Sequence, residues 1–144
     1  VVLPNRITTA LCTILRQCRL QIIVVIHANH AKELDHTVYR ACQTLRQHGI
    51  HLLNQSVLLH SINDQPQTLK RLSERLFECD VLPYYLHLLD RVQGAAHFYV
   101  DDDKAQILLA ALQNSLPGYL VPRLVREAAG APAKIMVFKT TVEH

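Results

Sequence analysis

The spacing of its apolar segments constrains the fold of this chain more than any other feature of the sequence. A β-branched run at residues 20–26 predicts a strand that is buried on both faces. Residues 50–53 and 81–86 predict two further strands, so successive strands begin about thirty residues apart, the length of one β-α-β unit. Such units wind right-handed and give a parallel sheet. The sequence therefore predicts an α/β fold with parallel strands.

Amphipathic segments around these strands predict helices at residues 8–17, 35–48, 65–79 and 101–114. The first helix is expected to be capped near Thr8, and the third by Asp64, with Pro66 in its first turn. Gly49 is expected to end the second helix in the C′ position. Shorter apolar runs at 120–124 and 135–138 predict two last strands, although Pro122 is unusual inside a strand.

Two architectures satisfy this pattern, an open doubly wound sheet and an arc of a (β/α) barrel. A complete eight-stranded barrel takes about 250 residues, so the 144 residues here would supply only part of one. The four glycines form no glycine-rich loop of the dinucleotide-binding kind. We expect residues 1–144 to form a single domain.

Composition excludes several classes of protein. Hydrophobic residues make up 49% of the chain, too many for a disordered one. The net charge of +3 comes from basic residues spread along the chain, which argues against a nucleic-acid surface. The longest apolar run, residues 22–26, is too short for a membrane span, and residues 1–6 show no signal-peptide pattern. No C-x-x-C spacing occurs, so we expect reduced thiols in a cytoplasmic protein; the cysteines are Cys12, Cys18, Cys42 and Cys79.

Polar side chains are expected beyond the carboxyl ends of the strands, where parallel α/β folds place their chemistry. They are His27, Asn29 and His30 after the first strand, Asn54 and Gln55 after the second, His87 and Asp90 after the third, and Glu127 and Lys134 in the last part.

Each of these residues has an ordinary structural explanation beside a functional one. His27 and His30 are spaced poorly for a metal pair, and Asn54 could simply satisfy backbone groups of a loop. Asp90 could form a surface ion pair with a neighbouring arginine. Lys134 could be a solvated charge, but it follows a small-residue loop and precedes an apolar run. A lysine in a desolvated pocket can lose its proton and attack a carbonyl group.

Short motifs follow one another in a fixed order along nearly the whole chain. They are residues 1–8 (VVLPNRIT), 27–30 (HANH), 54–59 (NQSVLL), 62–64 (IND), 83–86 (PYYL), Asp90, 94–98 (GAAHF), 118–122 (GYLVP) and 134–135 (KI). Together they resemble the lysine 2,3-aminomutase family. The pattern at residues 84–98 and the short tail after Lys134 are similar to the branch that makes (R)-β-lysine for the modification of translation elongation factor P.

The resemblance implies a radical S-adenosylmethionine isomerase on a TIM-type barrel, of which this chain would be roughly the C-terminal half. It implies three cofactors, which are pyridoxal phosphate, S-adenosylmethionine and a four-iron four-sulfur cluster. With them the family moves the amino group of L-lysine from carbon 2 to carbon 3. The cofactors carry this chemistry, while the protein binds and orients them.

The resemblance also gives roles to single positions. Lys134 matches the lysine that binds pyridoxal phosphate covalently. Asp90 matches an acid that binds the distal ammonium of the substrate, where a charge-assisted hydrogen bond would fix a flexible molecule. Glu127 stands where the family has a second acid, commonly aspartate. Gln55 matches a glutamine that contacts S-adenosylmethionine; His27, Asn29 and His87 fall on the same cofactor side.

The chain also departs from the family's pattern. The family holds its cluster with a C-x-x-x-C-x-x-C loop, and the four cysteines of this sequence do not have that spacing. We therefore expect no metal site in this chain, and we expect the chain to be inactive alone, without the cluster-binding part. Half a barrel would expose strand edges, so we also expect self-association. The alternative is a self-standing small α/β binding domain without catalytic activity.

Overall fold

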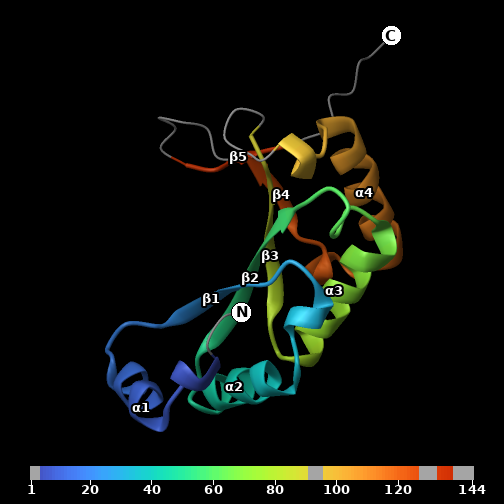
Figure 1. Ribbon diagram of the computed structural model, residues 1–144. Helices are drawn as coiled ribbons and strands as arrows, with labels where there is room; N and C mark the ends of the chain where they lie inside the picture. Colours follow the sequence, from blue (N-terminus) through green and yellow to red (C-terminus); the bar gives the residue numbers. More distant parts are fainter. Residues whose placement is uncertain (1–3, 91–95, 127–132, 138–144) are drawn as a thin grey trace.

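The computed structural model describes residues 4–90, 96–126 and 133–137, which form an α/β fold (Figure 1). The helices are α1 (Thr9–Gln17), α2 (His36–Gln47), α3 (Pro66–Glu78) and α4 (Asp102–Ser115). The strands are β1 (Ile23–His27), β2 (His51–Leu58), β3 (Leu82–Leu88), β4 (Arg123–Arg126) and β5 (Ile135–Met136). Short 3₁₀ turns lie at Pro4–Arg6, Ala31–Glu33, Ala96–Phe98 and Gly118–Leu120.

The five strands form one sheet in the order β1-β2-β3-β4-β5. Strands β1 to β4 are parallel, which confirms the predicted α/β class, whereas β5 runs antiparallel to β4. The last strand is therefore an exception to the predicted parallel order. Only residues 127–134 separate β4 from β5, and a parallel return needs a crossover of about a dozen residues or more. In the described residues the sheet runs from β1 to β5 and does not close on itself.

One face of the sheet is covered by helices, and Figure 1 shows α2, α3 and α4 along the same side of it. The alternate residues of β2 that point to this side are all buried, from Leu52 to Leu58. Two apolar clusters fill the space beneath the helices. One lies around α2, β1 and the second half of α3, and the other joins the first half of α3 and α4 to Leu86 and Leu124 of β3 and β4.

The predicted helix ends are largely confirmed. The Thr8 hydroxyl accepts a hydrogen bond from the Leu11 N–H at 3.2 Å, which caps α1. Asp101 caps α4 in the same way, through the N–H of Lys104 at 2.8 Å. Gly49 has a φ of +76° just after α2, as expected for a residue that ends a helix in the left-handed region.

Asp64 does not cap α3, and that prediction was wrong. The N-cap residue is Gln65, whose side chain makes no capping hydrogen bond, although Pro66 does begin the helix. The Asp64 carboxylate instead accepts hydrogen bonds from the Ser61 N–H and from the Lys104 ammonium. The charge of Lys104 gives this buried carboxylate a partner that an N-cap position would not provide.

Four strands also differ in extent from the prediction. β2 continues to Leu58, so Asn54, Gln55 and Ser56 lie within the strand rather than beyond it. His27 and His87 are likewise strand residues. The strand expected at residues 120–124 begins only at Arg123, after Pro122, because residues 118–120 form a 3₁₀ turn. The polar residues of these strands therefore lie on the faces of the sheet rather than beyond its carboxyl edge.

Candidate active-site face

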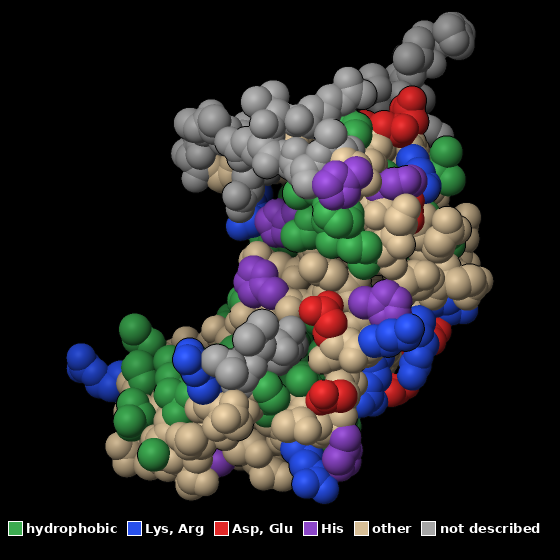
Figure 2. All heavy atoms as spheres, in the orientation of Figure 1, with side chains coloured by type: hydrophobic (Ala, Val, Ile, Leu, Met, Phe, Trp, Pro, Cys, Tyr) green, Lys and Arg blue, Asp and Glu red, His purple; other side chains and the backbone are tan. Residues whose placement is uncertain are grey.

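The face of the sheet opposite the helices carries most of the candidate site residues. Its apolar side chains remain unusually exposed: 55% for Ile23, 37% for Val25 and 40% for Leu82. Figure 2 shows the molecule hollowed beside the sheet, with histidine side chains along the hollow. We call this the bare face. A helix or another strand layer normally covers such a surface in a parallel sheet.

A single row of paired residues crosses the bare face. His27 of β1 is in register with Gln55 of β2, which is in register with Tyr85 of β3. Tyr85 is in turn in register with Arg123 of β4. Paired residues of neighbouring strands point to the same side of a sheet, so these four side chains lie next to one another. His27 and Gln55, which are predicted to face S-adenosylmethionine, are thus adjacent in the structure.

Lys134 joins this row from the segment before β5. Its Nζ lies 5.2 Å from the centre of the Tyr85 ring, within the range of a cation–π interaction. The residue is partly buried, and its amine lies against the aromatic ring. The structure therefore places the predicted covalent lysine against Tyr85, which is in register with Gln55 on the neighbouring strand.

A β-bulge explains why Tyr85 reaches this position. Asn54 pairs with Pro83, and the next residue of β2, Gln55, pairs with Tyr85, so Tyr84 is the extra residue on β3. Bulges re-aim side chains and bend a strand, and they are frequent near active sites. Here the two tyrosine rings lie side by side, with centres 3.8 Å apart.

The tyrosine pair has an electrostatic consequence. The hydrogen bond to the Tyr84 hydroxyl is the largest cause that raises the pKa of Tyr85 above its ordinary value. The charge of Arg123 acts in the opposite direction but does not outweigh it. Tyr85 therefore keeps its proton at neutral pH. The ring of His87 lies edge-on to Tyr85, with centres 5.7 Å apart, so His87 extends this aromatic group toward the carboxyl end of β3.

A buried polar network fixes the chain where β1 ends. Asn54 is only 1% exposed, and its Oδ1 accepts the Ala28 N–H at 2.9 Å. Its Nδ2 donates to the Ala28 carbonyl at 3.1 Å and to Ser56 Oγ at 2.9 Å. The Ser56 hydroxyl donates to the same Ala28 carbonyl at 2.9 Å. The Asn54 side chain thus makes the two hydrogen bonds that a neighbouring strand would otherwise make with the backbone of Ala28.

Asn63 holds the next residue in a similar way. Its Nδ2 donates to the carbonyls of Asn29 and Val57, at 2.8 and 2.9 Å. The Asn29 side chain accepts the Val57 N–H at 2.8 Å. This bond ties Asn29 to β2, and the prediction that Asn29 faces S-adenosylmethionine stays untested. The asparagine and aspartate of the motif at 62–64 therefore have a structural role that the sequence did not reveal.

The Asp64 carboxylate links the loop after β2 to α4. It is 4% exposed, and it bonds to the Lys104 ammonium at 2.5 Å and to His60 Nδ1 at 3.0 Å. Burial by itself would raise the pKa of Asp64, but the hydrogen bonds from Lys104 and His60 together hold that pKa below its ordinary value. This carboxylate is therefore ionised and structural, and it takes no part in the bare face.

Of the two predicted substrate acids, only Asp90 lies among the described residues, and it is not one of the four residues of the row. Asp90 lies two residues past the end of β3, at the carboxyl edge of the sheet. The pKa of Arg126 is raised mainly by its hydrogen bond with Asp102, and the charge of Asp90 contributes in the same direction. Glu127 lies outside the described residues. The predicted role of both acids remains a prediction.

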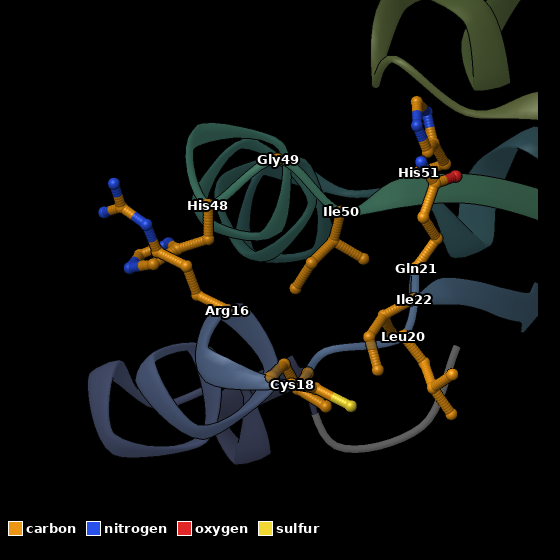
Figure 3. Close-up of a pocket in the computed structure, with 10 residues that line it drawn as sticks. Arg16, Cys18, Leu20, Gln21, Ile22, His48, Gly49, Ile50 and His51 are labelled. Atoms are coloured by element: carbon orange, nitrogen blue, oxygen red, sulfur yellow. The ribbon is translucent and has the colours of Figure 1, made fainter.

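A solvent-open pocket of about 160 Å³ lies at the opposite, amino-terminal edge of the sheet (Figure 3). Arg16 and Cys18 line it from the end of α1, and His48 and Ile50 from the connection between α2 and β2. In parallel α/β folds the chemistry lies at the carboxyl ends of the strands. We therefore do not assign this pocket to the site, although it is well formed.

The cysteines do not gather into a metal site. All four are free thiols; Cys12, Cys42 and Cys79 are buried and Cys18 is exposed. No group of three or more histidine, cysteine or acidic residues suited to a metal ion occurs in the described ranges. These residues do not fit an iron–sulfur cluster, which requires closely placed thiolates. Among the described helices, none is long and apolar enough for a membrane span.

The bare face defines a class of protein: a mainly parallel α/β protein in which a lysine amine lies against an aromatic ring on the face that no described helix covers. No family model matches the sequence. Curated proteins named L-lysine 2,3-aminomutase do match, with 51% identity over 94% of the chain for the protein of Haemophilus influenzae and 52% over 93% for that of Escherichia coli. The protein of Clostridium subterminale is 36% identical over 99% of the chain.

The chain belongs to the lysine 2,3-aminomutase family. It spans about 40% of the length of the Haemophilus and Escherichia relatives and corresponds to their C-terminal part. This confirms the resemblance that the ordered motifs indicated.

Proposed function

We propose that this chain is the C-terminal part of a lysine 2,3-aminomutase, which converts L-lysine to β-lysine by a radical 1,2-amino migration. The observation that carries the proposal is the 51–52% identity to proteins of that name over more than nine tenths of the chain. The placement of Lys134 on the bare face supports it independently. Because the chain spans only part of its relatives, the proposal for activity concerns the parent protein.

The bare face supports a place in a (β/α) barrel. In such a barrel helices cover the outside, and alternate strand residues point into the interior. The described strands have this division, since one side of β2 is buried by helices and the other carries Leu53, Gln55 and Val57 at intermediate exposure. We propose that the row from His27 to Arg123 lines the interior of the parent barrel, and that further strands would cover Ile23 and Val25.

Lys134 fits the residue that would hold pyridoxal phosphate. Its amine lies on the bare face, and the adjacent Tyr85 ring offers a flat apolar surface of the kind that a pyridine ring can pack against. When bound, pyridoxal phosphate stabilises electron-rich or radical centres next to the carbon it activates. The contribution of the chain is to fix the position of that amine and to keep bulk water away from one side of it.

Other residues would orient the remaining partners. We propose that Gln55, His27, Asn29 and His87 face S-adenosylmethionine, and that Asp90 and Glu127 bind the distal ammonium of L-lysine. A carboxylate suits that task because a charge-assisted hydrogen bond fixes the far end of a flexible substrate. The four-iron four-sulfur cluster does not fit the cysteines of this chain, so we assign its ligands to the rest of the parent protein.

The pattern at residues 84–98 favours the branch that supplies β-lysine for elongation factor P. The relatives from Haemophilus influenzae and Escherichia coli, at 51% and 52% identity, are nearer to this chain than that of Clostridium subterminale, at 36%. We propose that the parent acts in the cytoplasm on free L-lysine, with elongation factor P as an indirect partner. His87 stands where the fermentative branch usually has an aromatic residue, which supports the same proposal.

Binding of pyridoxal phosphate tests the role of Lys134 in this chain. The matched variants are Lys134→Ala and, as a control, Lys32→Ala, whose side chain is exposed on the 3₁₀ turn after β1. The absorbance change of pyridoxal phosphate on joining an amine is expected in the native chain and in Lys32→Ala, and it should be lost in Lys134→Ala. An unchanged spectrum with the native chain would favour the alternative, a binding domain without catalytic role.

Self-association follows from the same geometry. The edge of β1 and the exposed Ile23 and Val25 resemble the surface of a sheet that has lost its neighbour. We expect the isolated chain to form dimers or larger species, and Ile23→Lys to weaken them. Light scattering over a range of concentrations measures this, and a monomer at high concentration in the native chain would contradict it.

A further inference from the structure

The Tyr84–Tyr85 pair is the feature of the bare face that the motif roles do not explain. The bulge in β3 makes two consecutive residues place their rings together, 3.8 Å apart. An ordinary strand would send them to opposite faces. Because Lys134 Nζ lies 5.2 Å from the second of these rings, the bulge determines what the amine contacts.

We propose that Tyr85 is the positioning residue for Lys134, and that the bulge at Tyr84 exists to aim the Tyr85 ring at the Lys134 amine. The inference deepens the proposed function, since it concerns how the same lysine meets pyridoxal phosphate. Tyr85 acts through Lys134. The Tyr84 ring packs against Tyr85, and the two hydroxyl groups are hydrogen-bonded to each other. Tyr84 therefore holds the Tyr85 ring in place.

The neighbours of Tyr85 suit this role. Gln55 and Arg123 flank it in register on either side, and His87 lies edge-on 5.7 Å away. A lysine side chain otherwise samples many rotamers, and its ordering opposes any reaction that needs the amine in one place. A fixed ring that holds the amine removes part of that cost before the ligand arrives.

Attachment of the ligand is a balanced condensation. The neutral Lys134 amine forms a bond to the aldehyde carbon, one molecule of water leaves, and any ammonium proton passes to solvent. Nothing beyond the amine and the aldehyde is consumed. Tyr85 changes only the position of the amine before this step, so its removal should weaken attachment without abolishing it.

The first measurement does not depend on the ligand. A side chain lying over an aromatic ring has methylene resonances shifted upfield, and selective labelling of lysine allows those of Lys134 to be followed by NMR. We expect an upfield Lys134 signal in the native chain and in Tyr85→Phe, which keeps the ring, and its loss in Tyr85→Leu. Tyr119→Leu is the matched control, because Tyr119 is 60% exposed and its ring contacts Phe77.

The second measurement is the retention of pyridoxal phosphate on Lys134, trapped with borohydride and quantified by peptide mapping. Preorganisation of one long side chain corresponds to about a two- to ten-fold change in affinity. We expect Tyr85→Leu to weaken retention by that factor, and Tyr85→Phe and Tyr119→Leu to match the native chain. Circular dichroism shows whether each variant is folded; if Tyr85→Leu is not, the native and Tyr85→Phe spectra still decide the inference.

The outcomes separate the two proposals. An unshifted Lys134 signal in the native chain, or equal retention by folded Tyr85→Leu, overturns the positioning role. A shifted signal that Tyr85→Leu loses supports it, even if pyridoxal phosphate is retained by none of the variants. That last result would count against the proposed function of Lys134 in this chain alone.

Discussion

Replacement of Asn54 by alanine should destabilise the fold more than any surface change of the same kind. Asn54 is 1% exposed and binds both polar groups of the Ala28 peptide. In the variant the Ala28 N–H loses its side-chain partner at a residue with 0% exposure. The Ala28 carbonyl keeps the hydrogen bond from Ser56 at 2.9 Å, so one group rather than two is orphaned.

The expected size follows from that count. A buried donor without an acceptor costs about 1–3 kcal/mol, and the space left by the amide adds to it. We therefore expect Asn54→Ala to lower the free energy of unfolding by about 2–4 kcal/mol. Ser56→Ala should cost less, about 1 kcal/mol, because Asn54 still donates to the Ala28 carbonyl.

Urea unfolding followed by circular dichroism measures these differences. Asn114→Ala is the matched control, since Asn114 is exposed in the last turn of α4; a change of no more than about 0.5 kcal/mol is expected there. If Asn54→Ala were no more destabilised than Asn114→Ala, the polar network would not anchor the end of β1, and the reasoning would fail.

Three further predictions follow from single residues. Gly49→Ala should lower stability by about 1–2 kcal/mol because of the φ of +76°, whereas Gly118→Ala should be nearly neutral; urea unfolding compares them, and no Cβ would meet a neighbour at either site. Burial, with a smaller effect of Cys79, raises the pKa of Cys42 to about 11, so in the folded chain a thiol reagent should label Cys18 but not Cys42; rapid labelling of Cys42 would refute this. The folded pKa of Asp64 lies below its ordinary 3.8, so its stabilisation is complete above that value and is lost as the pH falls through the folded one. Native protein should therefore lose stability as the pH falls below about 4, and Asp64→Asn should not show this loss; parallel acid titrations of the two proteins would contradict the assignment.

Much of the fold could be predicted because it depends on local chemistry. β-Branched runs located β1, β2 and β3, and periodicity with capping residues located α1 to α4 to within a residue or two. The extent of β2 could not be predicted, because Asn54 and Ser56 find their partner in Ala28, more than 25 residues away. The antiparallel direction of β5 follows from the short connection between β4 and β5. The two residues of β5 do not themselves indicate it.

The candidate site could be predicted only residue by residue. The ordered motifs pointed to Lys134, Gln55 and His27, and the structure places these three on the bare face. Tyr85 lies beside Gln55 and contacts Lys134 because of a bulge between β2 and β3. A bulge is a property of strand pairing, so two adjacent tyrosines in the sequence gave no sign of it.

Amino-group migration in the parent protein tests the central claim most directly. The parent, assembled without oxygen with its cluster, S-adenosylmethionine and pyridoxal phosphate, would receive L-lysine labelled with ¹⁵N at the α-amino group. NMR should find the label on carbon 3 in the native protein, with no conversion in Lys134→Ala and normal conversion in Lys32→Ala. Unchanged lysine together with rearrangement of another amino acid would contradict the substrate, and full conversion by Lys134→Ala would contradict the role of this lysine.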